Sequence, residues 1–142
     1  MKISGVKKIK LNIFKNNKGD LLKFISKKNS FYSKFGEIYF NEINFKKRKG
    51  WILHKKNTSI MTVCFGEVKF KLIDGRKKSK TFNKENDFTL NKNNHGVLLI
   101  PPGVWFSFTT NKKKSVLANF INSAHSDDEI IKVNKINNYE IE

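Results

Sequence analysis

Short runs of alternating apolar and polar residues, separated by turn residues every several positions, are the feature that most constrains this fold. Period-two alternation is typical of half-buried β-strands, and helical periodicity is almost absent. The pattern therefore predicts an all-β, antiparallel sandwich or barrel. The expected strands cover residues 1–14, 21–26, 37–45, 49–58, 60–65, 68–73, 97–100, 104–108 and 116–121, with further short strands within 79–90.

The chain has 142 residues, which suits one domain spanning 1–142 with one hydrophobic core. Ser126 is followed by three acidic residues, a pattern that favours a helix N-terminus, so one short C-terminal helix is expected. A single cysteine, Cys64, excludes an internal disulfide. We expect a soluble, cytoplasmic protein, because no long apolar stretch or signal-like segment is visible.

The formal net charge of +17 indicates an anionic partner. Nucleic acid, an anionic membrane and a small anionic ligand are the three classes to weigh. Only Arg48 and Arg76 are arginines, and arginine is the usual reader of base edges, so sequence-specific DNA recognition is disfavoured. A bias toward AT-rich codons would also raise the lysine content, and this alternative stays open.

Two stretches, 49–58 and 98–108, carry the candidate functional residues, and we expect them to line one pocket for an anionic sugar ligand. Alternation places Ile52 and His54 on one face of the first stretch, and Trp51 and Lys55 on the other. An imidazole facing a pocket can act as an acid or base near neutral pH. A hydrogen-bonded core histidine is an equal alternative for His54.

Two tryptophans and one arginine have both functional and structural explanations. Trp51 and Trp105 could stack on a base or sugar ring, or could be core aromatics. Arg76 could grip a phosphate with two hydrogen bonds, or could simply be solvated. The three histidines show no metal-ligand spacing, so no metal site is expected. The carboxylate that would orient His54 cannot be ranked among Asp20, Glu37, Glu42 and Asp74.

Several segments, in order, resemble the dTDP-4-dehydrorhamnose 3,5-epimerase family over about residues 15–135. Asp74–Phe82 is similar to its Asp-x-Arg-x-x-Ser-Pro-Thr-Phe segment. Leu99–Trp105 resembles its Ile-Pro-x-Gly strand, and equally the Ile-Pro-Pro-Gly-Val-Trp strand of the 3,4-ketoisomerases acting on dTDP-4-keto-6-deoxyglucose. The other matching blocks are 17–21, 49–54 and 66–70.

The resemblance implies a cupin-type jelly roll, usually a homodimer, that needs no metal or organic cofactor. It implies a pocket for a nucleotide-linked sugar, and a role in making deoxysugars for surface polysaccharides such as lipopolysaccharide. Lys49, Trp51, Lys55, Arg76, Trp105 and Asn119 would bind this substrate, with the three basic residues holding its diphosphate.

The sequence departs from the family at its most informative positions. The epimerases carry Arg-Gly-x-His and the ketoisomerases Arg-Gly-x-His-x-His-Lys; here Lys49 stands for the arginine and Ile52 for the first histidine. His54 and Lys55 match the second histidine and the lysine, and residues 116–120 lack the family's late tyrosine. We therefore expect a metal-independent epimerase or isomerase with His54 as its acid/base. A catalytically inactive sugar-nucleotide-binding or accessory protein is the first alternative, and a basic nucleic-acid-binding β-domain the second.

Overall fold

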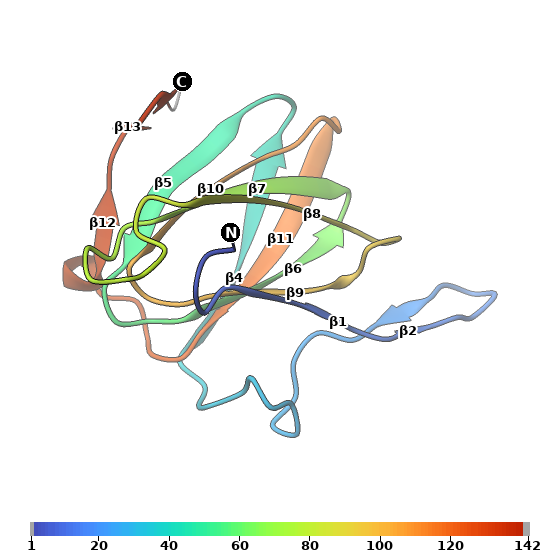
Figure 1. The fold of residues 1–142 in the computed structure, drawn as a ribbon. Helices are drawn as coiled ribbons and strands as arrows, with labels where there is room; N and C mark the ends of the chain where they lie inside the picture. Colours follow the sequence, from blue (N-terminus) through green and yellow to red (C-terminus); the bar gives the residue numbers. More distant parts are fainter. Residues whose placement is uncertain (1, 141–142) are drawn as a thin grey trace.

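Two five-stranded antiparallel sheets stack face to face in the computed structural model, which describes residues 2–140 (Figure 1). Most neighbouring strands are not consecutive in the chain, which is the jelly-roll arrangement expected from the sequence. The first sheet runs β1 (Lys7–Lys10), β9 (Gly96–Ile100), β6 (Ser59–Phe65), β11 (Lys114–Ile121) and β4 (Glu37–Asn44). The second runs β12 (Ile130–Lys132), β5 (Arg48–His54), β10 (Val104–Thr109), β7 (Glu67–Asp74) and β8 (Glu85–Asn91).

The main core fills the space between the two sheets. It is built from the inward-facing apolar residues of strands in both layers, and burial of this surface is the chief stabilising contribution. A sandwich of this kind interdigitates side chains over about 10 Å between the sheets. Its largest buried members include Ile43, Met61, Phe70, Leu72, Leu98, Phe108 and Leu117.

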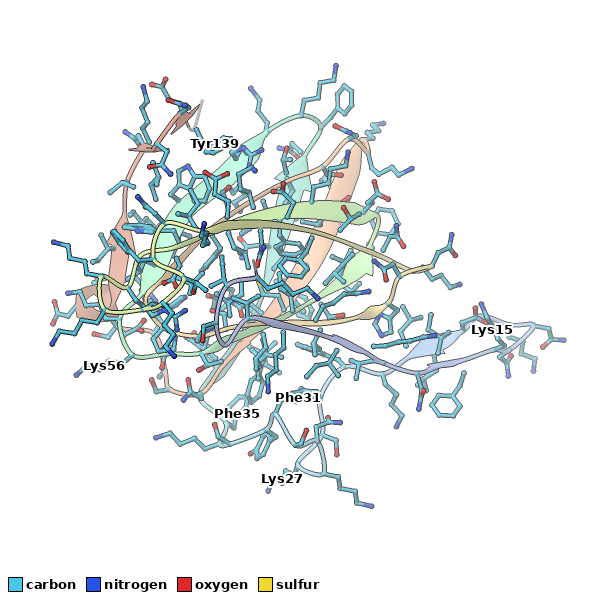
Figure 2. The ribbon with its side chains drawn as sticks, in the orientation of Figure 1. Lys15, Lys27, Phe31, Phe35, Lys56 and Tyr139 are labelled. Atoms are coloured by element: carbon cyan, nitrogen blue, oxygen red, sulfur yellow. The ribbon has the colours of Figure 1, made fainter. Side chains whose placement is uncertain are left out.

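The outer face of the first sheet is only partly covered. Phe31 and Tyr32, in the segment below the sheet, pack with Ile60, Val97 and Phe120 (Figure 2). Further along the same face, large apolar side chains stay exposed: Ile38 by 42%, Phe40 by 69% and Phe65 by 63%. This part of the sheet therefore presents an apolar surface to its surroundings.

A hairpin of β2 (Ile13–Phe14) and β3 (Leu21–Leu22) projects from the body of the molecule, and Lys15 lies on its outer part (Figures 1 and 2). Its apolar residues Phe14 and Leu21 are 52% and 56% exposed. A two-stranded hairpin has little stability by itself in water.

The C-terminal segment covers the outer face of the second sheet. The expected helix is one 3₁₀ turn, η1 (Asp127–Glu129), and the chain then pairs with β5 as β12. The acidic start is present, but no apolar 3.6-residue repeat follows it to bury a helix face. A last hairpin, β13 (Lys135–Ile136) and β14 (Tyr139–Glu140), brings Tyr139 over Trp51. Within residues 2–140, no helix has the length and apolar character to cross a membrane.

Candidate functional site

A cavity of about 320 Å³ lies between the sheets at the end where β4, β5 and β11 meet β12. Both layers contribute walls, so its side chains come from distant parts of the sequence. Its polar lining includes Tyr39 and Asn41 from β4, His54 from β5 and Asn119 from β11. Ile52, Met61, Phe106 and Phe108 make its apolar surface.

A register shift between β5 and β10 brings Lys49 to the cavity side. Ile52 pairs with Phe106 and Lys49 pairs with Phe108. Lys49 and Ile52 are three positions apart in β5, whereas their partners are only two positions apart in β10. This is a β-bulge, in which two residues on one strand oppose one on the other. Lys49, Ile52 and His54 therefore share one face, and the Lys49 ammonium lies 2.8 Å from Asn41 Oδ1.

Gly50 makes this close approach of the strands feasible. Its φ is +118°, a conformation that favours glycine. A Cβ atom here would meet the carbonyl oxygen of Phe106 at 2.6 Å and Cα of Ser107 at 2.9 Å. The bulge therefore requires glycine at this position.

His54 and Glu129 form a buried pair beside the cavity. Nδ1 of His54 lies 2.6 Å from Oε2 of Glu129, and the two residues are 3% and 8% exposed. The other carboxylate oxygen, Oε1, accepts the backbone N–H groups of Lys56 at 2.9 Å and Asn57 at 2.7 Å. Glu129 is thus held on three sides, and it fixes the orientation of the imidazole.

The charge on Glu129 sets the tautomer of His54. Burial opposes ionisation, but the backbone N–H groups of Asn57 and Lys56 and the His54 ring outweigh it and lower the pKa of the Glu129 carboxyl. An ionised carboxylate only accepts hydrogen bonds, so Nδ1 of His54 carries the proton. His54 lines the cavity, and its Nε2 is buried without a hydrogen-bond partner among the described residues, so the lone pair of this nitrogen is not engaged by the protein.

Tyr39 and Asn119 form a polar pair on the first sheet, across the cavity from the sheet that carries His54. The two residues face each other in the β4–β11 ladder, and Asn119 Nδ2 donates to the Tyr39 hydroxyl at 2.8 Å. Burial raises the pKa of Tyr39 above its ordinary value, against the opposing effect of the Asn119 hydrogen bond. The phenol is therefore protonated at neutral pH and can donate to a ligand.

Apolar groups surround the imidazole. The Phe106 ring stacks on His54 with centroids 5.9 Å apart and an interplanar angle of 13°. Together with Ile52 and Phe108 it limits the water that can reach Nε2. A base on one wall and a phenol on the other, in a mostly apolar cavity, suit removal of a proton from a carbon next to a carbonyl group.

The lysines predicted to bind substrate differ in their positions. Lys49 is exposed at the cavity edge, where it bonds Asn41. Lys55 also has an exposed side chain, but it does not line the cavity; its backbone N–H donates to the Glu129 carbonyl at 2.8 Å. Lys132, which was not predicted, lines the cavity from β12.

Neither predicted tryptophan lies in this cavity. Trp51 is fully buried on the outer face of the second sheet, where its indole N–H donates to the Tyr139 carbonyl at 3.1 Å. Trp105 neighbours Phe106 in β10 and so faces the other way, packed against Gly75. Neither indole can therefore stack on a ligand inside this cavity, and a role for either ring elsewhere stays a prediction.

Arg76 does make a two-pronged contact, but with Asp74 rather than with an open phosphate site. Its Nε and Nη2 atoms lie 2.8 and 2.9 Å from the two oxygens of Asp74, and Nη2 also donates to the Ser4 carbonyl. Ser79 and Thr81 donate to the same buried carboxylate. This cluster fixes the loop after β7 and does not line the cavity.

The carboxylate beside His54 is none of the four that the sequence suggested. Asp20 pairs with Lys15 and Lys92, Glu42 with Lys114, and Asp74 with Arg76. Glu37 lines the cavity but accepts the backbone N–H of His125 at 2.9 Å. Glu129 was assigned to a helix start, and nothing in its local sequence linked it to His54.

A larger, more open groove lies at the opposite end of the sandwich, with a volume of about 750 Å³. Phe45, Phe65, Lys47 and three consecutive lysines, 112–114, contribute to its walls. It contains no acid/base pair, so the smaller cavity at His54 is the candidate site. Among residues 2–140, no group of three or more His, Cys, Asp or Glu side chains is placed to hold a metal ion.

The fold and this cavity together define a jelly-roll protein with a buried histidine–carboxylate pair between its sheets. Residues 1–139 match the sequence profile of dTDP-4-dehydrorhamnose 3,5-epimerase, so the chain belongs to that family. The resemblance noted in the sequence is thereby confirmed. No curated protein sequence gives a significant match.

Solved structures share this fold. A dTDP sugar isomerase from Desulfovibrio desulfuricans G20 has a TM-score of 0.90 and 29% identity, covering 92% of this chain and 85% of its own. The Bacillus anthracis str. Ames dTDP-4-dehydrorhamnose 3,5-epimerase, with TDP and pyrophosphate bound, has a TM-score of 0.82 and 21% identity over 93% and 83% of the two chains. An epimerase from Legionella pneumophila Philadelphia 1, in complex with dTDP-4-keto-L-rhamnose, has a TM-score of 0.84 and 18% identity over 94% and 74%.

Proposed function

We propose that this protein is an epimerase or isomerase that acts on a nucleotide-linked 4-keto-6-deoxy sugar of the dTDP type, in deoxysugar synthesis for surface polysaccharides. The observation that carries the proposal is that His54 lines the cavity with a buried Nε2 that has no hydrogen-bond partner in the described part of the chain, while Glu129 holds Nδ1 at 2.6 Å. A neutral imidazole in this tautomer is a base aimed at whatever occupies the cavity.

In the proposed reaction His54 Nε2 removes a proton from a carbon next to the ketone. The electron pair of the broken C–H bond forms the enolate, and the Tyr39 hydroxyl donates a hydrogen bond to its oxygen. Glu129 stabilises the imidazolium that results. Return of a proton to the same carbon from the opposite side inverts that centre. For the ketone to move, the enolate oxygen instead takes up a proton, the hydroxyl on the carbon that was deprotonated gives one up, and a proton returns to the former carbonyl carbon.

Lys49 and Lys132 are the cations best placed for the diphosphate. Lys49 is beside the cavity through Asn41, and Lys132 lines it. The Arg76 guanidinium is occupied by Asp74, so the phosphate role proposed for it from the sequence is transferred to these lysines. The bound TDP of the Bacillus protein and the dTDP-sugar of the Legionella protein support a dTDP-linked ligand in this family.

Proton NMR of dTDP-4-keto-6-deoxyglucose with the protein in deuterated water tests the proposal. Loss of a ring proton signal next to the ketone is expected, and it identifies the carbon attacked. His54→Gln should abolish the exchange. His95→Gln is a matched control, because His95 is also buried but bonds the Lys23 carbonyl outside the cavity.

An accessory protein that binds the sugar nucleotide without turning it over is the second candidate. Ile52 favours it, because isoleucine cannot exchange a proton at the position where the family resemblance places its first histidine. Broadened nucleotide signals without any exchange in the same NMR experiment would support the accessory role and overturn the enzymatic one.

We also propose that the protein is a homodimer. The exposed apolar side chains Ile38, Phe40 and Phe65 on the first sheet, and the projecting hairpin with Phe14 and Leu21, support a partner surface. Light scattering coupled to gel filtration should give twice the 16.6 kDa chain mass, and Phe40→Glu should give the monomer. A monomeric wild type would contradict this part of the proposal. A cytoplasmic location stays a prediction.

A further inference from the structure

Two residues that line the same cavity from opposite sheets each have a buried polar atom without a hydrogen-bond partner among residues 2–140. One of these atoms is Nε2 of His54, which the proposed reaction uses. The other is Oδ1 of Asn119, whose residue is 1% exposed. A buried carbonyl oxygen left without a donor is costly, so an acceptor in a cavity wall indicates where a ligand donates a hydrogen bond.

The hydrogen bond between Asn119 and Tyr39 decides which groups remain for a ligand. Asn119 Nδ2 donates to the Tyr39 oxygen at 2.8 Å, and this assigns the donor half of the amide to the protein. Oδ1 is then a pure acceptor. The Tyr39 hydroxyl keeps its own hydrogen, so this wall of the cavity offers one acceptor and one donor on residues that face each other across the β4–β11 ladder.

A ketone flanked by a free hydroxyl is the chemical group that complements this wall. Its carbonyl oxygen needs a donor, which Tyr39 provides, and its hydroxyl needs an acceptor, which Asn119 Oδ1 provides. We propose that Asn119 makes the cavity selective for an α-hydroxy ketone by accepting the hydrogen bond of the hydroxyl next to the carbonyl. The inference rests on the proposed function and narrows its substrate class.

For a 4-keto-6-deoxy sugar this selectivity falls on one position. The ketone at carbon 4 has carbon 3, with a hydroxyl, on one side, and carbon 5, with the ring oxygen and the methyl carbon, on the other. Of the groups on the two carbons next to the ketone, only the 3-hydroxyl can donate to Asn119. A 3-deoxy ligand would leave Oδ1 buried without a partner, and sites that hydrogen-bond a substrate hydroxyl reject analogues lacking it.

The test measures dissociation constants by titration calorimetry for two ligands, dTDP-4-keto-6-deoxyglucose and its 3-deoxy counterpart. The wild type should prefer the 3-hydroxy ligand by about 10-fold or more. Asn119→Leu removes Oδ1 and should bring the two constants within about twofold of each other. Asn119→Ala, in which the cavity gains space, serves if the leucine variant fails to fold.

Tyr39→Phe removes the acceptor that fixes Asn119 Nδ2, so the amide is free to turn while Oδ1 itself is still present. Affinity for both ligands should fall, and the preference for the 3-hydroxy ligand should weaken less than in Asn119→Leu, which removes Oδ1. Equal binding of both ligands by the wild type, a preference that survives in the folded Asn119 variant, or no binding of either ligand would each overturn the inference. A preserved preference without proton exchange would instead overturn the proposed catalysis and leave the ligand selectivity standing.

Discussion

Oε2 of Glu129 lies 2.6 Å from Nδ1 of His54 although 75 positions separate the two residues in the sequence. The carboxylate reaches the imidazole because β12 pairs with β5 directly after the η1 turn, with Ile130 opposite His54. The contact therefore joins the C-terminal segment to the centre of the cavity. It also determines which nitrogen of the ring is free to act as a base.

Glu129→Gln should lower the rate of proton exchange by about 100- to 10,000-fold, as for other histidine–carboxylate pairs that lose the carboxylate. The glutamine amide oxygen could still accept the backbone N–H groups of Lys56 and Asn57. Its NH₂ group would then face Nδ1 of His54 and favour the tautomer with the proton on Nε2, which cannot act as a base through that nitrogen. Exchange rates from NMR, with circular dichroism to verify the fold, make the comparison. An unchanged rate would remove Glu129 from the mechanism.

Tyr39→Phe should lower the exchange rate by about 100-fold or more, because the enolate oxygen would lose its proton-bearing neighbour. Tyr32→Phe provides a control on a tyrosine outside the cavity, where the ring packs against Phe120 with centroids 6.0 Å apart. The two variants are compared by single-turnover NMR. Equal rates for both would show that the Tyr39 hydroxyl takes no part.

Asp74→Asn should reduce the free energy of unfolding at pH 7 by about 2–3 kcal/mol, since a buried carboxylate with charged and hydroxyl donors is lost. Burial opposes ionisation of Asp74, but hydrogen bonds from Arg76, Thr81 and Ser79 outweigh it and hold the pKa far below its ordinary value. A pKa that is lower in the folded state stabilises the protein above the unfolded value and ceases to do so as pH falls through the folded one.

The difference between wild type and Asp74→Asn should therefore be constant from pH 6 to 8 and narrow as pH falls below about 4. Urea unfolding at several pH values measures it. A difference that does not change with pH would show that Asp74 acts through packing and not through its charge.

Trp51→Phe should reduce the free energy of unfolding by about 1–3 kcal/mol, because it leaves space in a fully buried site and removes the hydrogen bond to the Tyr139 carbonyl. Affinity for the sugar nucleotide should not change, since the indole lies on the outer face of the sheet. Calorimetric titration tests the second point. A loss of affinity without a loss of stability would show instead that Trp51 contacts the ligand.

The strands were predictable wherever one face is apolar and buried. Residues 60–65 and 68–73 were expected as strands, and they correspond to β6 and β7. A strand at 37–45 was also expected, but the sequence analysis did not predict which of its residues face the interior. In β4 the apolar residues Ile38 and Phe40 are the exposed ones, whereas Tyr39 and Asn41 line the cavity. In this strand the polar residues face inward and the apolar ones outward, the reverse of the usual pattern. That reversed alternation is the feature of the sequence from which Tyr39 could have been predicted as a site residue.

The assignment of side chains to the site depended on contacts that sequence spacing does not contain. Alternation along the strand predicted that His54 and Trp51 lie on opposite faces of the sheet, and they do: His54 faces the cavity and Trp51 the outer face. The partner carboxylate comes from a turn whose position depends on strand pairing between distant segments. Arg76 was predicted to grip a phosphate with two hydrogen bonds, whereas in the structure its guanidinium makes two hydrogen bonds to Asp74, two residues before it.

Gly50 has a consequence that reaches beyond its own contacts. Lys49 and His54 lie on the same side of β5 only because the bulge after Gly50 changes the side to which the strand directs its residues. The added methyl group of a Gly50→Ala variant would touch no ligand, yet the backbone of β10 would have to move away from it. The positions of Lys49 and His54 relative to each other would then change. A binding assay would then report a defect at the ligand site, although its cause would be a single methyl group in the wall behind it.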